Sequence, residues 1–271
     1  MKYISIIKSY YPSLSKTEKK VADYILKEKG KIIYQTLIEI SKNVNVGEAT
    51  IIRFVKKIGF DGFQDLKLEV AKEDKLEIEE NYENYIDESA ANMAKSIDNT
   101  KAILNINQLN LAIDMIMKAK RVYSYGVGSS GLTSDETKNR FMRLGVMVNS
   151  VTDTHFQMMY SSLCGEDDVI LAFSLSGYTK DILESINLAK KNNTKIVAVT
   201  SHGLSPIAQL GDCVILTSEK ENPLDGGSLL GRISQLYILD LLCTGYSLKN
   251  REDALNLKEK TAESIIGKSA N

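Results

Sequence analysis

The sequence predicts an all-α helix-turn-helix domain followed by an α/β domain whose parallel sheet is flanked by helices. The chain has 271 residues, more than the roughly 100 to 200 that usually form one domain, so we expect two cores. The first part combines helical periodicity with a tight turn, and the part after residue 120 alternates short apolar runs with amphipathic stretches. We divide the chain into a helix-turn-helix domain at 1–75, a helical connector with lead-in helices at 76–120, an α/β domain at 121–250 and a helical tail at 251–271.

A capping box marks the start of an early helix. Ser15 is followed three residues later by Glu18, a pair that can satisfy two N–H groups where a helix begins. Apolar side chains then recur at helical spacing, at Val21, Ala22, Ile25 and Leu26. We therefore expect a helix that runs to about Gly30 and braces the segment that follows it.

Residues 37–63 predict a helix, a tight turn and a second helix. Asn45 lies in the turn, where a left-handed backbone is often required, and Asn tolerates that conformation better than most residues. Gly47 is then expected to be the N-cap of the second helix. This arrangement is a helix-turn-helix, the unit that places its second helix in the major groove of DNA.

The second helix of this unit has one apolar face and one polar, basic face. The apolar side chains are Ile51, Phe54, Val55 and Ile58. The side chains that we expect to contact DNA are Thr50, Arg53, Lys56 and Lys57. Arginine can form two hydrogen bonds with guanine and lysine can hold phosphates, so Arg53 is the best candidate to contact bases. The alternative is that these cations form only the solvated face of a helical bundle.

Charge is distributed unevenly along the chain. The formal net charge is -1, but residues 1–75 hold 15 Lys or Arg against 10 Asp or Glu. Residues 76–88 hold six acids and no base. The basic part coincides with the helix-turn-helix. The acidic segment contains no glycine or proline, so we expect it to be a helical connector near the domain boundary.

Short apolar runs predict the strands of the second domain. They are RVYSYGV at 121–127, VMVNSV at 146–151, DVILAFS at 168–174, TKIVAVT at 194–200 and DCVILT at 212–217. Strands that are this uniformly apolar are buried on both faces, which is typical of a parallel sheet flanked by helices. We expect a flavodoxin-like or Rossmann-like arrangement.

The first of two glycine-rich loops follows the first predicted strand. Residues 126–131, GVGSSG, satisfy the G-x-G-x-x-G pattern of dinucleotide binding, and the acid Asp153 follows the next strand. This pattern alone suggests NAD. The hydroxyls of Ser129 and Ser130, however, suit a terminal phosphate better than the close passage of a pyrophosphate.

The second loop favours the phosphate. Residues 174–179, SLSGYT, follow a predicted strand and supply three hydroxyls and a glycine before a helix that starts near Lys180. Hydroxyls and backbone N–H groups at a helix N-terminus can bind a phosphate dianion without a metal or an arginine. Two such loops at neighbouring strand ends predict one shared anion site.

Both halves resemble known domains. Residues 15–67, notably EATIIRFVKKIGFDGFQDLK, resemble the N-terminal domain of RpiR-type transcriptional regulators, which usually carry Gly and Ser where this chain has Asn45 and Gly47. Residues 121–248 are similar to the SIS, or sugar isomerase, domain, which binds phosphorylated sugars. The resemblance implies that Gly128 and Gly177 let the backbone approach the phosphate closely. It also implies that hydroxyls hold the phosphate, namely those of Ser129, Ser130, Ser174, Ser176 and Thr179. The alternative is that these serines only cap helices.

The resemblance is weaker for an enzyme. Aldose–ketose isomerisation needs a general base near the sugar carbons, and often a histidine that opens the ring. The chain has His155, at an expected strand end, and His202, in an expected turn. Glu184 could contact sugar or lie on the helix surface. SIS enzymes of the arabinose-phosphate isomerase type have a histidine before a glycine pair, and this chain has Leu224 and Asp225 there. Gly231 replaces the serine that RpiR regulators usually carry.

We therefore expect a DNA-binding transcriptional regulator of carbohydrate metabolism whose operator affinity changes when a phosphorylated sugar binds. It is expected not to be an enzyme and to use no cofactor. The alternatives are a sugar-phosphate isomerase and an NAD-sensing redox regulator. Operator half-sites are usually paired, so a homodimer or a dimer of dimers is expected.

The remaining expectations concern cysteines, metals and membranes. Cys164, Cys213 and Cys243 are widely spaced and are expected to be buried thiols, and the sequence shows no metal-ligand spacing. The chain contains neither an apolar run of about 18 residues nor a signal-peptide pattern. We expect a cytoplasmic protein without a membrane partner.

Overall fold

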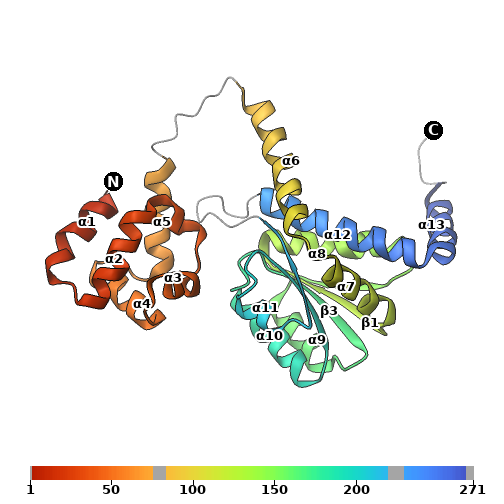
Figure 1. The fold of residues 1–271 in the computed structure, drawn as a ribbon. Coiled ribbons are helices and arrows are strands. Elements are labelled where there is room, and N and C mark those ends of the chain that lie inside the picture. The colour runs from red at the N-terminus through yellow and green to blue at the C-terminus, as the bar shows by residue number, and fades with distance from the viewer. Residues whose placement is uncertain (1, 76–83, 219–228, 267–271) are drawn as a thin grey trace. The chain divides into compact units, whose positions relative to one another are not determined.

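The computed structural model describes residues 2–75, 84–218 and 229–266 (Figure 1). These residues form two compact units, one that ends at Tyr85 and one that starts at Ile86. The predicted fold class is confirmed, because a helical part is followed by a five-stranded parallel sheet with flanking helices. The predicted acidic connector lies mostly at 76–83, outside the described residues.

The described part of the first unit consists of helices. They are α1 (Lys2–Tyr10), the 3-10 helix η1 (Tyr11–Ser13), α2 (Lys16–Glu28), the 3-10 helix η2 (Lys29–Tyr34), α3 (Leu37–Val44), α4 (Glu48–Lys57) and α5 (Phe63–Lys75). Ile25, Ile40 and Phe54, from α2, α3 and α4, are fully buried in its core.

The predicted capping box at the start of α2 is present. The Glu18 N–H donates to Ser15 Oγ over 3.3 Å, and the Ser15 N–H donates to the Glu18 carboxylate over 2.7 Å. The sequence predicts a helix to about Gly30, and α2 ends two residues earlier, at Glu28. Lys29 adopts a positive φ of 49°, which interrupts the α-helix, and the 3-10 helix η2 follows.

The second unit alternates helices with strands. Its helices are α6 (Tyr85–Ile103), α7 (Ile106–Lys118), α8 (Gly128–Met142), α9 (Thr154–Leu163), α10 (Lys180–Lys191), α11 (Pro206–Leu210), α12 (Leu229–Lys249) and α13 (Arg251–Ile266). Its strands are β1 (Arg121–Tyr125), β2 (Val148–Val151), β3 (Asp168–Phe173), β4 (Lys195–Thr200) and β5 (Cys213–Leu216). Each predicted apolar run contains one of these strands.

All neighbouring strands pair in parallel, in the order β2-β1-β3-β4-β5. Helices α7, α8 and α12 pack on one face of the sheet, and α10 and α11 pack on the other (Figure 1). β3 is buried along its whole length, as expected for a strand covered on both faces.

The strand order places β1 beside β3 at the centre of the sheet. The chain moves outward from β1 to β2 in one direction, and from β3 to β4 and β5 in the other. Arg121 at the start of β1 forms an ion pair of 2.6 Å with Asp168 at the start of β3, which is its partner in the strand register. In open α/β sheets the point where the strand order reverses is where ligands bind, outside the carboxyl ends of the strands.

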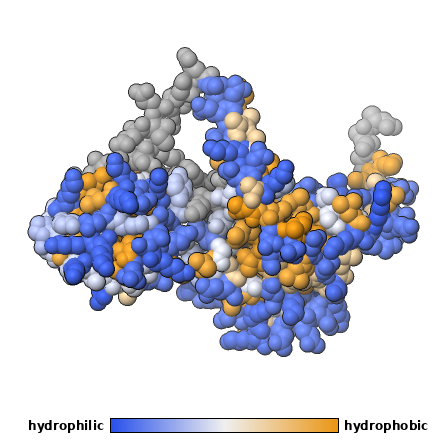
Figure 2. Space-filling model, in the orientation of Figure 1, coloured by the Kyte–Doolittle hydropathy of each residue, from blue (hydrophilic) through white to orange (hydrophobic). Residues whose placement is uncertain are grey.

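The surface of the second unit includes apolar side chains on α7. Figure 2 shows hydrophobic residues gathered over this helix, and Ile106, Leu111 and Met117 are each at least 39% exposed. Among the described residues, no helix combines the length and apolar character needed to cross a membrane.

Candidate functional site

Helices α3 and α4 form the predicted helix-turn-helix. Asn45 has the expected left-handed backbone, with φ 55° and ψ 53°, and Gly47 is the N-cap of α4. The Ser41 hydroxyl donates to the Val46 carbonyl over 2.6 Å and holds the turn. A second capping box, between Thr36 and Glu39, starts α3 and was not predicted, although its T-x-x-E pattern is visible in the sequence.

The two faces of α4 differ as expected. Ile51, Phe54 and Val55 are fully buried against the helical core. Arg53 is exposed, and its Nη2 donates to the Thr50 hydroxyl over 3.3 Å. The two side chains therefore lie together on the solvent-facing side of α4, where a DNA groove could accommodate them.

The two predicted lysines of α4 have different surroundings. Lys57 Nζ donates to the Ser13 carbonyl and to the Glu18 carboxylate, each over 2.9 Å. It therefore connects α4 to the start of α2 inside its own unit. Lys56 is exposed and forms no ion pair with the residues that the structure describes. Of the two lysines, Lys56 is the more available for a DNA phosphate.

The two hydroxyl-rich loops follow β1 and β3, the adjacent strands at the reversal of the strand order. The first loop leads into α8 and the second into α10. Because parallel strands end at the same edge of the sheet, both loops and both helix N-termini lie at that edge. The positive ends of the two helix dipoles favour an anion there.

Glycines shape the first loop. Gly128, the first residue of α8, has a left-handed φ of 56°. A Cβ atom on Gly126 would lie 2.3 Å from the Ser130 carbonyl oxygen, so only glycine lets α8 start this close to β1. Ser129 and Ser130 follow in the first turn of α8, which contains no acid.

The second loop is more enclosed. Gly177 has a φ of 68°, and a Cβ atom on it would lie 2.1 Å from Ser205 Oγ. Ser174 is buried, and its hydroxyl lies 2.9 Å from that of Thr179, the N-cap of α10. Ser176 is partly exposed. The helix begins at Lys180, as expected.

Several of these hydroxyls already accept hydrogen bonds from the protein. Ser176 Oγ accepts the Tyr178 N–H over 3.3 Å, and Ser174 Oγ accepts the Gly177 N–H over 3.1 Å. Ser130 Oγ accepts the side-chain amide of Gln235 over 3.0 Å. A hydroxyl has one hydrogen to donate and two lone pairs that accept. Protein donors therefore occupy acceptor positions, and the arrangement suits a ligand that only accepts, such as a phosphate dianion.

Helix α12 contacts both loops, which the sequence did not indicate. Gln235 reaches Ser130 in the first loop. A Cβ atom on Gly231 would lie 2.4 Å from Leu175 Cδ2 of the second loop. The glycine that replaces the serine of RpiR regulators therefore makes room for Leu175.

The residues considered for catalysis lie on three different segments of the second unit. His155 is exposed on the first turn of α9, so its predicted position at a strand end is wrong. The Asp153 carboxylate that precedes it caps this helix and accepts the Phe156 N–H over 3.0 Å. His202 is 8% exposed, in the turn after β4. Glu184 is exposed and pairs with Lys180 over 3.7 Å.

The cysteines are buried, as predicted. Burial raises the pKa of Cys164 and of Cys213 to about 11, and that of Cys243 to about 12. Thiols with such pKa values are protonated at neutral pH and react slowly. The described residues contain no group of three or more His, Cys, Asp or Glu side chains that could hold a metal ion.

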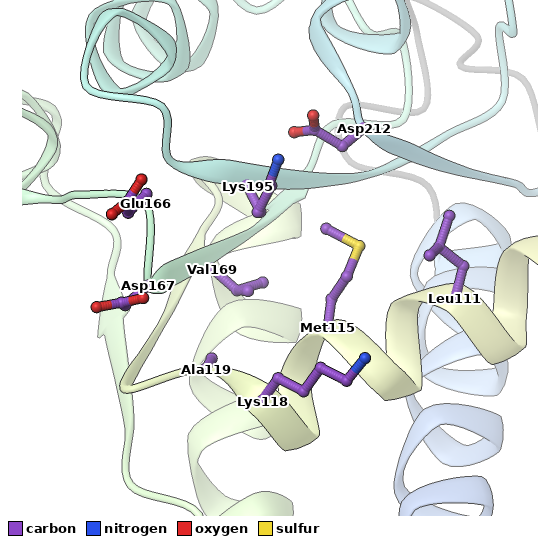
Figure 3. Close-up of a pocket in the computed structure, with 9 residues that line it drawn as sticks. All are labelled: Leu111, Met115, Lys118, Ala119, Glu166, Asp167, Val169, Lys195 and Asp212. Carbon is purple, nitrogen blue, oxygen red and sulfur yellow. The ribbon is translucent and has the colours of Figure 1, made fainter.

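A separate cavity of about 340 Å³ lies at the opposite edge of the sheet (Figure 3). Its apolar wall comes from α7, including Met115, and its charged rim comes from the amino ends of β3, β4 and β5. Asp212 on this rim is already bonded to Lys190 and to the Ile196 N–H. None of the predicted DNA-binding or phosphate-binding residues lines this cavity.

Comparisons with known families match both units. A model described as a helix-turn-helix domain of the rpiR family matches residues 1–77, and the SIS domain model matches residues 115–245. An uncharacterised HTH-type transcriptional regulator of Clostridium perfringens is 35% identical over 93% of this chain and 94% of its own length. The HTH-type transcriptional regulator RpiR of Escherichia coli K12 is 30% identical over 92% of this chain and 87% of its own length.

A solved structure matches this chain over nearly its whole length. The Vibrio vulnificus NanR protein, complexed with ManNAc-6P, has a TM-score of 0.90 and 25% sequence identity. The match covers 98% of this chain and 99% of that protein. Similarity at this level extends over both the helical part and the α/β part.

Proposed function

The chain belongs to the rpiR family of helix-turn-helix transcriptional regulators with a SIS domain, and we propose that a phosphorylated sugar bound in this domain controls its affinity for operator DNA. The observation that carries the proposal is the pair of hydroxyl-rich loops at the reversal of the strand order. They bring two helix N-termini and several hydroxyl donors to one edge of the sheet.

The phosphate would be held by both loops. Ser130 and Ser176 each accept a protein hydrogen bond, which leaves their own hydrogens for phosphate oxygens. Ser129, Ser174 and Thr179 complete the hydroxyl set, and Gly128 and Gly177 allow the backbone conformations that the loops need. Charge-assisted hydrogen bonds of this kind are stronger than neutral ones. NanR, which shares both units, is complexed with ManNAc-6P, so amino-sugar phosphates belong among the first ligands to test.

Operator DNA would be bound through α4. Arg53 and Thr50 are assigned to base edges in the major groove, and Lys56 to a phosphate. Lys57 would contribute mainly through its bonds to the start of α2, which hold α4 in place.

The ligand would act by preferring one quaternary arrangement, because a ligand with equal affinity for both states shifts no equilibrium. We propose a homodimer or a dimer of dimers, in agreement with paired half-sites and with the exposed apolar side chains of α7, including Ile106 and Leu111. We further propose that the protein acts in the cytoplasm and binds its sugar phosphate without converting it.

A thermal-shift screen tests the ligand half of the proposal. The panel contains N-acetylhexosamine, hexose and pentose phosphates, the same sugars without phosphate, and NAD(H). One phosphosugar should raise the melting temperature, and its unphosphorylated form should not. Ser176→Ala should weaken binding by about 10- to 100-fold, as expected for a lost hydrogen bond to a charged group. Ser162→Ala, which removes an exposed hydroxyl on α9, is the matched control.

Three further results decide between the alternatives. Stabilisation by NAD(H) alone would support the redox regulator instead. If NMR detects conversion of the phosphosugar to an isomer, the result would support an isomerase. Fluorescence anisotropy with operator DNA should show an affinity that changes when the phosphosugar is added, and an unchanged affinity would contradict the proposed control of DNA binding.

A further inference from the structure

Gln235 of α12 bridges two residues of α8. The residue is only 2% exposed. Its Nε2 donates to Ser130 Oγ over 3.0 Å, and its Oε1 accepts the hydroxyl of Thr133 over 3.1 Å. One buried amide thus connects a residue of the first phosphate loop to a residue one turn further along the same helix.

This bridge is not needed to hold the two helices together. Ile238, Leu239 and Leu242 of α12 are fully buried in the core on that face of the sheet. Arg140 of α8 also pairs with Asp240 of α12. A buried amide that lacks partners is costly, and hydrogen bonds inside a protein add little net stability, so an apolar residue would serve packing alone at least as well. The position of Gln235 therefore calls for a reason other than packing.

The chemistry of Ser130 supplies that reason. The Thr133 hydroxyl donates to Oε1, which turns the amide nitrogen of Gln235 toward Ser130. The Gln235 N–H then occupies a lone pair of Ser130 Oγ. The hydrogen of the Ser130 hydroxyl cannot point back at that N–H, so it is available to a ligand at the N-terminus of α8.

We propose that Gln235 is a positioning residue for the phosphate, which it serves by holding Ser130 as a hydrogen-bond donor, with Thr133 fixing the orientation of the amide. The inference rests on the proposed function of the two loops. It predicts that the site binds anions that only accept hydrogen bonds more tightly than ligands that also donate them. It also makes α12 a functional part of the phosphate site.

The inference can be tested on the full chain with inorganic phosphate as the probe. The melting temperature is measured against phosphate concentration at constant ionic strength, with chloride as the reference, and each variant is compared with its own value in chloride. Gln235→Met keeps the length of the side chain but cannot donate, and should weaken phosphate binding about 5- to 10-fold. Gln235→Glu can only accept from Ser130 and adds a negative charge, so it should weaken binding about 100-fold or abolish it.

Two further changes separate positioning from packing. Thr133→Ser keeps the hydroxyl and should bind phosphate like the parent, whereas Thr133→Val should weaken binding. Ser234→Ala is the matched control, because Ser234 is buried beside Gln235 on α12 and, among the described residues, its hydroxyl donates to the Gly231 carbonyl of its own helix and not to a phosphate loop. Its phosphate affinity should equal that of the parent.

A double-mutant cycle with Ser130→Ala gives the decisive readout. If Gln235 acts through Ser130, adding Gln235→Met to Ser130→Ala should cause no further loss of phosphate affinity. A further loss equal to that of the single variant would overturn the inference, as would parent-like binding by both Gln235 variants. A parent protein that is stabilised neither by phosphate nor by any sugar phosphate would instead overturn the proposed function.

Discussion

Replacing Gly177 by alanine should damage the second phosphate loop more than the equivalent change damages the first. Gly177 and Gly128 both have left-handed backbones, with φ values of 68° and 56°. Their surroundings differ. A Cβ atom on Gly177 would lie 2.1 Å from Ser205 Oγ and 2.8 Å from Thr200 Oγ1, whereas a Cβ atom on Gly128 would meet no atom within 4 Å. Comparing Gly177→Ala with Gly128→Ala therefore separates the free-energy cost of a steric clash from that of backbone strain.

The structure sets the size of the two effects. A side chain on a left-handed backbone costs about 1 to 2 kcal/mol, which is all that Gly128→Ala should lose. Gly177→Ala must also displace Ser205, whose hydroxyl is buried and caps α11 by accepting the Ala208 N–H. Loss of a cap costs about 1 kcal/mol more, so we expect a total of roughly 2 to 3 kcal/mol for Gly177→Ala. For a unit of this size, that corresponds to about 4 to 12 °C in melting temperature.

Calorimetry of the full chain measures both variants. Ile51→Ala leaves a cavity in the core of the first unit and therefore shows which unfolding transition belongs to that unit. Gly165→Ala is the control, because Gly165 has no left-handed φ and a Cβ atom there would meet nothing within 4 Å. Gly177→Ala should also bind phosphate more weakly than Gly128→Ala. Equal losses of stability in these two variants would refute the steric argument.

Other predictions concern α4. Arg53→Ala should cost about 1 to 3 kcal/mol in operator binding and relax base preference. Lys56→Ala should weaken binding to all sequences and reduce the slope of log affinity against log salt concentration by about one. Anisotropy titrations with operator and scrambled DNA at several salt concentrations distinguish them, and identical profiles would contradict the assignment. Lys57→Ala should destabilise the helical unit by about 0.5 to 1 kcal/mol, whereas Lys56→Ala should not. The Glu18 pKa lies below its ordinary 4.5, chiefly because the Ser15 N–H donates to the carboxylate, and also because Lys57 does. A group with a lowered pKa stabilises the fold above its unfolded-state pKa. The effect of Lys57→Ala should therefore shrink as the pH falls below about 4, and a constant difference in melting temperature would contradict this role.

The features that could be predicted from the sequence have their causes close together in the chain. The capping box of α2 joins residues three apart, and the left-handed turn depends on the single residue Asn45. The strands were recognised because burial on both faces requires an unbroken apolar run, as in β3. The end of α2 could be predicted only to within two residues, because the positive φ of Lys29 has no sequence signal comparable to a glycine.

The roles of individual polar side chains are set at longer range. Lys57 is bonded to Glu18, 39 residues away, so a lysine with the spacing of a DNA contact proves to connect two helices of its own unit. Gln235 and Ser130 are 105 residues apart, and no local pattern distinguishes this glutamine from a surface one. The two loops were expected to share a site because each follows a strand, and the neighbouring positions of β1 and β3 are what bring them together. The sheet topology therefore brings two loops with separate local sequence patterns into one site. Helix α12 follows the last strand and packs on the same face of the sheet as α8, so it can contact that site.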